Sequence, residues 1–164
     1  MISNPVYEAM NAQIGHEMSS AYLYLSMAAY FESVNLSGFA KWMKVQFQEE
    51  QEHAMKFYEY ILDRGGKIVL PAIEQPRSDF GSPREAFEVT YGHEQKVTAL
   101  ILNIYKVATA ENDVASQIFL QWFINEQVEE EKNASRILDL LNKVGQNVGS
   151  LYQLDHQLGK RSGD

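Results

Sequence analysis

The chain has 164 residues and no cysteine, and 22 acidic against 14 basic residues give it a formal net charge of −8. The lack of cysteine excludes disulfides and thiolate metal ligands, and the negative charge argues against nucleic acid as a partner. No stretch reaches the roughly 20 apolar residues of a membrane span, and residues 1–6 do not resemble a signal peptide. We therefore expect one cytoplasmic domain over residues 1–164, with no membrane partner.

Proline and glycine divide the chain into long uninterrupted segments that we expect to be helices. The first is expected over residues 5–34, with Pro5 in its first turn and Asn4 as its cap. A second is expected over residues 37–64. It stops at Gly65, where a left-handed C-terminal cap forms easily.

The second half of the chain repeats this pairing after a long connector, residues 66–81. The third helix is expected over residues 83–111, where Ser82 and Glu85 have the spacing of a capping box. The fourth is expected over residues 113–144. Each pair is joined by a short turn and should form an antiparallel hairpin.

A short fifth helix is expected over residues 150–158, opened by Ser150, and a loose tail over residues 159–164. The connector over residues 66–81 is long enough to travel the ~40 Å length of a helix of this kind. The pattern therefore predicts an all-α fold, a four-helix bundle with one long crossover and a short C-terminal fifth helix.

Each of the four long segments has apolar residues at alternating three- and four-residue spacing, which marks the side that faces the bundle core. One glutamate interrupts each apolar stripe near mid-helix. At ~1.5 Å per residue, each lies ~20–25 Å from the turn that joins its pair. The four should therefore meet at one depth, with His53 one turn from the second of them. This glutamate layer consists of Glu17, Glu50, Glu94 and Glu130.

One core-facing glutamate is more often a surface side chain that reaches solvent, but four at one depth need compensation. Uncompensated, they would cost several kcal/mol each against a total stability of ~5–15 kcal/mol. No lysine or arginine lies on the stripes near this depth, whereas two divalent cations would balance four carboxylates. An oxygen-rich set with one imidazole fits iron or manganese. The Glu50–His53 spacing also matches di-iron carboxylate bundles.

These residues, the long crossover and the fifth helix resemble the prokaryotic non-heme ferritins of the ferritin-like superfamily. The resemblance implies a ferroxidase centre in which Glu50 bridges two irons. It implies a first iron held by Glu17, Glu50 and His53, and a second held by Glu50, Glu94 and Glu130.

The resemblance also implies roles for neighbouring residues. Gln127 would lie beside the irons as a weak or indirect ligand, and Tyr24 would lie close to them. Glu49, Glu126 and Glu129 would form a third iron site together with the glutamate at position 130. A solvated acidic face is the alternative for these three residues, and an ordinary core tyrosine is the alternative for Tyr24.

Two departures place the chain within the superfamily. Bacterioferritins and rubrerythrins have a second Glu-x-x-His where this chain has Gln127 and Glu130. Gln51 stands where a bacterioferritin would offer methionine to heme, so we expect no heme.

The resemblance implies iron storage. Fe(II) would be oxidised with dioxygen or peroxide to Fe(III) and kept as a ferric oxyhydroxide mineral in a hollow homo-oligomeric shell of 24 subunits. Two alternatives remain open. One is a di-iron oxidase or peroxidase that stores no iron. The other is a structural helical bundle that acts through protein contacts alone.

Overall fold

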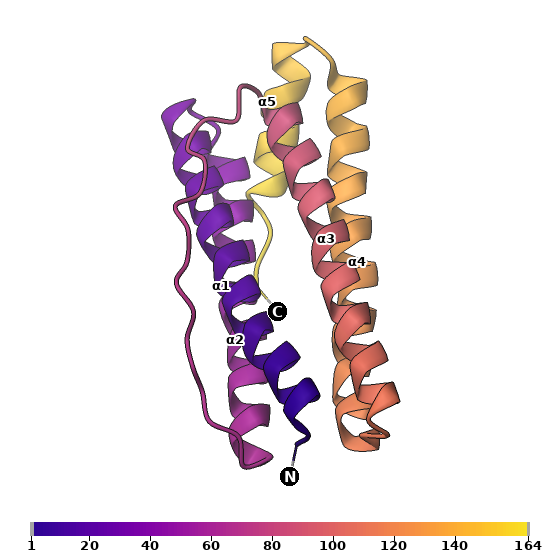
Figure 1. The fold of residues 1–164 in the computed structure, drawn as a ribbon. Helices are drawn as coiled ribbons and strands as arrows, with labels where there is room; N and C mark the ends of the chain where they lie inside the picture. Colours follow the sequence, from indigo (N-terminus) through magenta and orange to yellow (C-terminus); the bar gives the residue numbers. More distant parts are fainter. Residues whose placement is uncertain (1, 164) are drawn as a thin grey trace.

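The computed structural model describes residues 2–163. Helices α1–α4 lie side by side along one long axis, and α5 packs at one end of the bundle (Figure 1). The predicted all-α bundle with a short fifth helix is confirmed, and every helix in the described residues is too short or too polar to span a bilayer. In chain order the helices are α1 (Asn4–Ser33), α2 (Ser37–Asp63), α3 (Pro83–Ala110), α4 (Val114–Val144) and α5 (Val148–Leu158).

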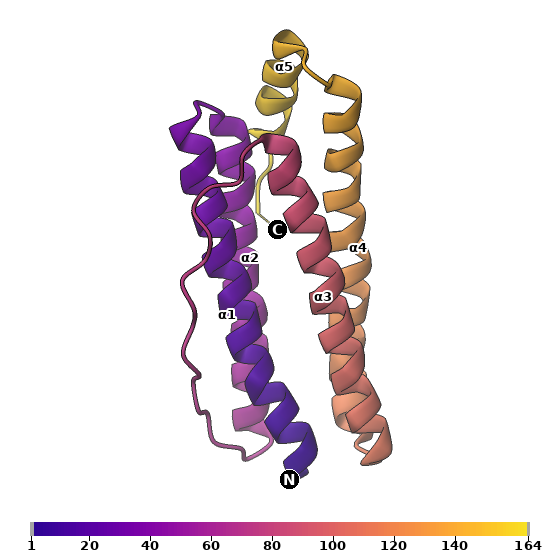
Figure 2. The same ribbon diagram turned by 45° about the horizontal axis from the view of Figure 1, so that its top comes forward.

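The connector between α2 and α3 runs along the outside of the bundle from one end to the other (Figures 1 and 2). Hydrogen bonds fix it to α1: Asn11 pairs with both the backbone oxygen and the backbone nitrogen of Val69, at 2.7 and 3.0 Å. Further along, the Ser26 hydroxyl donates to the carbonyl of Arg77 at 2.7 Å. The connector carries the chain from the end of α2 back to the end of the bundle where α2 begins. Helices α2 and α3 therefore run in the same direction.

Two apolar clusters fill the interior, one toward the α5 end and one toward the opposite end. On α1 the change from one cluster to the other falls between Ile14 and Tyr24, and on α2 it falls between Met43 and Ala54. The four residues of the glutamate layer occupy this gap and are buried. Apolar packing on both sides therefore isolates the layer from solvent along the bundle axis.

A side-chain cap explains where α3 begins. The Ser82 hydroxyl accepts from the backbone nitrogen of Glu85 at 3.1 Å, as the capping-box pattern predicts. The prediction that Asn4 caps α1 is wrong, because Asn4 is itself the first helical residue and Ser3 precedes it.

Helix α5 begins two residues before Ser150, its predicted start, because the Asn147 side chain caps it by accepting from the backbone nitrogen of Ser150 at 2.9 Å. The helix is fixed to the bundle through Asp155, whose carboxylate accepts from the backbone nitrogen of Phe39 at 2.9 Å. A side chain at Gly38 would overlap the carbonyl oxygen of Asp155. Asp155 thus caps the start of α2 from another helix.

The tail after α5 is not loose at Arg161, contrary to the prediction. Its guanidinium Nη2 lies 2.6 Å from Glu49 Oε2, and its guanidinium carbon lies 4.5 Å from the centre of the Trp42 ring. Asp164, also part of the predicted tail, lies outside the described residues.

Candidate metal centre

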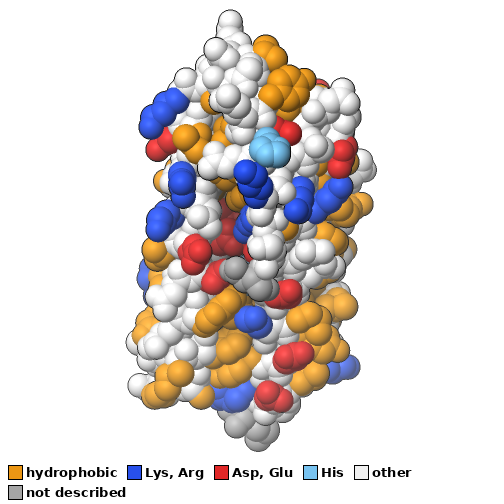
Figure 3. Space-filling view, turned by 180° about the vertical axis from the view of Figure 1, so that it is seen from behind, with side chains coloured by type: hydrophobic (Ala, Val, Ile, Leu, Met, Phe, Trp, Pro, Cys, Tyr) orange, Lys and Arg blue, Asp and Glu red, His pale blue; other side chains and the backbone are white. Residues whose placement is uncertain are grey.

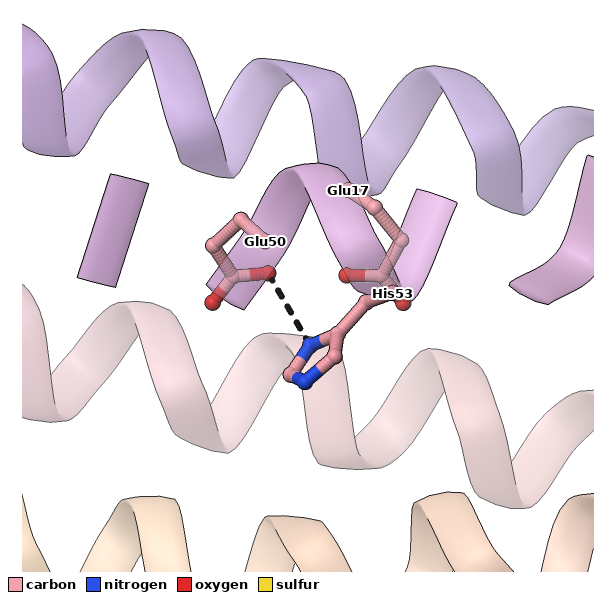
Figure 4. Close-up of side chains that lie close together, drawn as sticks. All are labelled: Glu17, Glu50 and His53. Atoms are coloured by element: carbon pink, nitrogen blue, oxygen red, sulfur yellow. Dashed lines mark ion pairs between the residues drawn. The ribbon is translucent and has the colours of Figure 1, made fainter. Parts of the chain in front are cut away.

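Helices α1 and α2 bring Glu17, Glu50 and His53 together at mid-bundle. One potential ligand atom from each lies within 4.8 Å of the other two. Glu17, Glu50 and His53 are only 1%, 1% and 4% exposed, respectively. Their side chains point toward one another (Figure 4). His53 Nδ1 lies 3.5 Å from Glu50 Oε2, as expected for residues one turn apart. A buried site with two carboxylates and one imidazole can hold a transition-metal ion.

A second group of potential ligands lies on the other side of the imidazole. His53, Glu126 and Glu130 also offer one ligand atom each within 4.8 Å of one another. His53 Nε2 lies 4.0 Å from Glu126 Oε1. The imidazole therefore lies between a carboxylate of α2 and a carboxylate of α4.

Among the described residues, neither group of three includes Glu94, although Glu94 is buried at the same depth. The Tyr24 hydroxyl donates to Glu94 Oε1, and Gln127 Nε2 lies 3.1 Å from Glu94 Oε2. These two predicted site residues therefore orient Glu94. Gln127 therefore contacts the metal centre through its hydrogen bond to the Glu94 carboxylate.

Two further glutamines hold carboxylates in the same way, although neither was predicted to have a role. Gln13 Nε2 donates to Glu17 Oε1 at 2.9 Å, and Gln46 Nε2 donates to Glu130 Oε2 at 3.0 Å. Both glutamines are fully buried. Their spacing in the sequence could have indicated this role. Each glutamine lies four residues before a layer glutamate of its own helix, so both lie on the inward face. Counting Gln127, three of the four layer glutamates accept from a glutamine amide.

One more polar pair, which is only partly buried, was not predicted. His93 Nε2 lies 2.8 Å from Ser20 Oγ, and its ring meets the Tyr24 ring edge-on with centroids 6.0 Å apart. His93, which directly precedes Glu94, thus packs against Tyr24, which orients Glu94.

Burial sets the charge state of the layer. It raises the pKa of Glu17 to about 7 and the pKa of Glu130 to about 8. Burial and the neighbouring carboxylates hold the pKa of Glu50 well above its usual value, and burial raises the pKa of Glu94. Burial also lowers the pKa of His53 to about 4, so its imidazole is neutral at pH 7 and keeps a lone pair for a metal.

Two carboxylate oxygens are buried and, within the described part of the chain, make no hydrogen bond: Glu17 Oε2 and Glu50 Oε2. Carboxylate oxygens only accept, so a proton on one of the groups or a cation is needed to satisfy them. Buried unsatisfied groups of this kind are uncommon in native structures and require an explanation. The donor set fits a metal ion such as iron.

The three acidic residues predicted to form a third site with Glu130 have different surroundings. Glu126 lies beside His53, whereas Glu49 is paired with Arg161. Glu129 is exposed on α4. Only Glu126 shares a group with Glu130 among the described residues.

Comparison with known proteins agrees with this geometry. A family model described as a ferritin-like domain matches residues 7–144. The chain is 44% identical to the bacterial non-heme ferritin of Bacteroides fragilis strain 638R, over 98% of this chain and 100% of that one. It is 38% identical to the bacterial non-heme ferritin of Staphylococcus haemolyticus, over 100% of this chain and 99% of that one. It superposes on the open pore ferritin of Archaeoglobus fulgidus with a TM-score of 0.98 at 47% identity, covering 99% of each chain.

Proposed function

The chain belongs to the ferritin family, and from this premise we propose that it is a ferroxidase that stores iron. Fe(II) is its substrate, dioxygen or peroxide is the oxidant, and Fe(III) is kept as a ferric oxyhydroxide mineral. We assign the binding of two irons to Glu17, Glu50, His53, Glu94 and Glu130.

The unpartnered oxygens of Glu17 and Glu50 are the observation that carries this proposal. Each is buried and makes no hydrogen bond within residues 2–163 unless the two carboxyl groups share a proton. Removing such groups from water without a partner is costly. Bound Fe(II) offsets that cost, which supports a site built for cations.

The chain's own residues move protons and fix geometry. With pKa values of about 7 and 8, the carboxyl groups of Glu17 and Glu130 hold protons in part at neutral pH. Binding of Fe(II) releases these protons to solvent. The Tyr24 hydroxyl has a pKa raised well above its usual value by burial and by Glu94, so it stays protonated and keeps donating to Glu94. Two Fe(II) ions supply one electron each to the oxidant.

Storage requires an enclosed space, which one bundle does not provide. We propose a closed homo-oligomeric shell of 24 chains in the cytoplasm, since only a closed symmetric assembly makes a cavity. The exposed apolar side chains of the connector support burial between chains, because Val69 is 56% exposed and Leu70 is 66% exposed. A third iron site at Glu49, Glu126, Glu129 and Glu130 is part of the same proposal.

Glu17→Ala tests the ferroxidase assignment. We expect loss of rapid Fe(II) oxidation in stopped-flow absorbance, with an unchanged particle mass by size-exclusion light scattering. Glu8→Ala is the matched control, because Glu8 is an exposed glutamate on the same helix, and it should oxidise Fe(II) normally. Normal oxidation by Glu17→Ala would refute the assignment. A particle too small to enclose a cavity would favour a di-iron oxidase that stores no iron.

A further inference from the structure

The C-terminal tail runs from α5 along the bundle toward the candidate metal centre. The described chain ends about halfway along the bundle (Figure 1). On the rear face, acidic side chains lie in a hollow with lysine and arginine side chains next to it (Figure 3). Arg161 from the tail pairs with Glu49 of α2 at 2.6 Å, and the two side chains are only 20% and 15% exposed.

We propose that Arg161 is a place-holding cation: its guanidinium occupies the position at Glu49 that Fe(II) or Fe(III) would take beside the centre. The tail then acts as a removable strap that limits how readily a third iron binds. The inference rests on the proposed function, because it concerns the passage of iron next to the ferroxidase site.

The position of Glu49 links the strap to the centre. Glu49 directly precedes Glu50, one of the proposed iron ligands, on α2. A metal ion bound by Glu49 would therefore lie close to the centre, and the Arg161 guanidinium occupies that position in the structure.

Few contacts hold Arg161 in place. They position its guanidinium, but they can also break and release it. They comprise the ion pair with Glu49 and the stacking on Trp42. Arg161 Nη1 is buried and has no hydrogen-bond partner within residues 2–163, so the guanidinium is incompletely satisfied. A guanidinium does not lose its proton near neutral pH. The strap must therefore move away, rather than change charge, when a metal ion binds Glu49.

Arg161→Gln removes the competing charge and keeps a polar, shorter side chain. We expect the first two Fe(II) per chain to bind and oxidise as before. A third Fe(II) should bind about five- to tenfold more tightly in anaerobic titration calorimetry, the size expected for one partly screened charge. Arg161→Lys keeps the charge but loses the planar fork, so it should give a smaller gain.

Two controls separate this effect from a structural one. Lys160→Gln removes one positive charge from the exposed neighbouring residue and should leave the third affinity unchanged. Glu49→Gln removes the contested carboxylate, so adding Arg161→Gln to it should have no further effect. Equal third affinities for Arg161→Gln and the unmodified protein would overturn the proposal, as would a gain that persists in the Glu49→Gln background.

Failure of the proposed function gives a different result. In that case the unmodified protein would not oxidise Fe(II) in the first two equivalents at all. The calorimetric comparison reads binding alone, so it decides the role of Arg161 whether or not oxidation follows.

Discussion

The Gln46 side-chain amide donates to Glu130 Oε2 at 3.0 Å and thereby joins α2 to α4 through the glutamate layer. Both residues are buried. The amide holds one oxygen of Glu130 in place, which leaves the other oxygen of the carboxylate available for a metal ion.

Gln46→Leu removes this donor at nearly constant volume. Hydrogen bonds to charged groups contribute about 1.5–3 kcal/mol, so we expect Fe(II) affinity at the second position to fall by about tenfold or more. Anaerobic Fe(II) titration measures the change. Gln48→Leu alters an exposed glutamine two residues away and should bind normally. If both variants bind alike, the amide does not position Glu130.

The raised carboxyl pKa values predict that the metal-free protein loses stability as pH rises. Glu17 and Glu130 keep protons up to about pH 7 and 8 in the folded state, whereas an unfolded glutamate loses its proton near pH 4.3. The folded chain therefore binds more protons, and stability falls with pH. His53 acts oppositely below its unfolded pKa of about 6.5, because burial lowers its folded pKa to about 4.

Between pH 6.5 and 8 the carboxyl groups therefore dominate the pH dependence of stability. We expect the melting temperature of the metal-free protein to fall across this window. Glu130→Gln should flatten the decline, because an amide does not titrate. A melting temperature that rises between pH 6.5 and 8 would contradict the charge state assigned to the layer.

Asp155→Ala should loosen α5 and the tail that follows it. Loss of a helix cap costs about 1 kcal/mol, and here the cap spans two helices, since Asp155 accepts from Phe39. Asp155→Asn keeps an acceptor and should cost less. Hydrogen exchange of the α5 amides measures the effect directly. Unchanged exchange in Asp155→Ala would mean that apolar packing alone fixes α5.

Gly38→Ala tests the same docking from the other side. A methyl group at position 38 would overlap the carbonyl of Asp155, so α5 must shift to accept it. We expect a larger loss of thermal stability than in Asp155→Ala. Gly92→Ala is the control, because a side chain at Gly92 meets open space on α3 and a helical alanine is favoured over glycine. Equal melting temperatures for the two glycine variants would argue against close packing at Gly38.

The fold and the glutamate layer were predictable because they depend on local regularities. Helical periodicity places residues three and four apart on one face, and a constant rise per residue converts position into depth. Those two rules sufficed to put the four residues of the glutamate layer at one level, where the structure buries them.

Contacts between distant segments were not predictable in this way. Arg161 and Glu49 are 112 residues apart, and their pairing depends on where α5 docks and how the tail turns back. The Gln46–Glu130 bond likewise depends on the rotation of α2 and α4 about their axes. The start of α5 was missed for a local reason, since valine and glycine after Asn147 are weak helix formers.

Anomalous X-ray diffraction at the iron edge, from crystals soaked in Fe(II) without oxygen, tests the central claim most directly. The account predicts two iron peaks within the glutamate layer, one bounded by Glu17, Glu50 and His53 and the other on the side of Glu94 and Glu130. A layer without anomalous density, while iron occupies other parts of the protein, would contradict it.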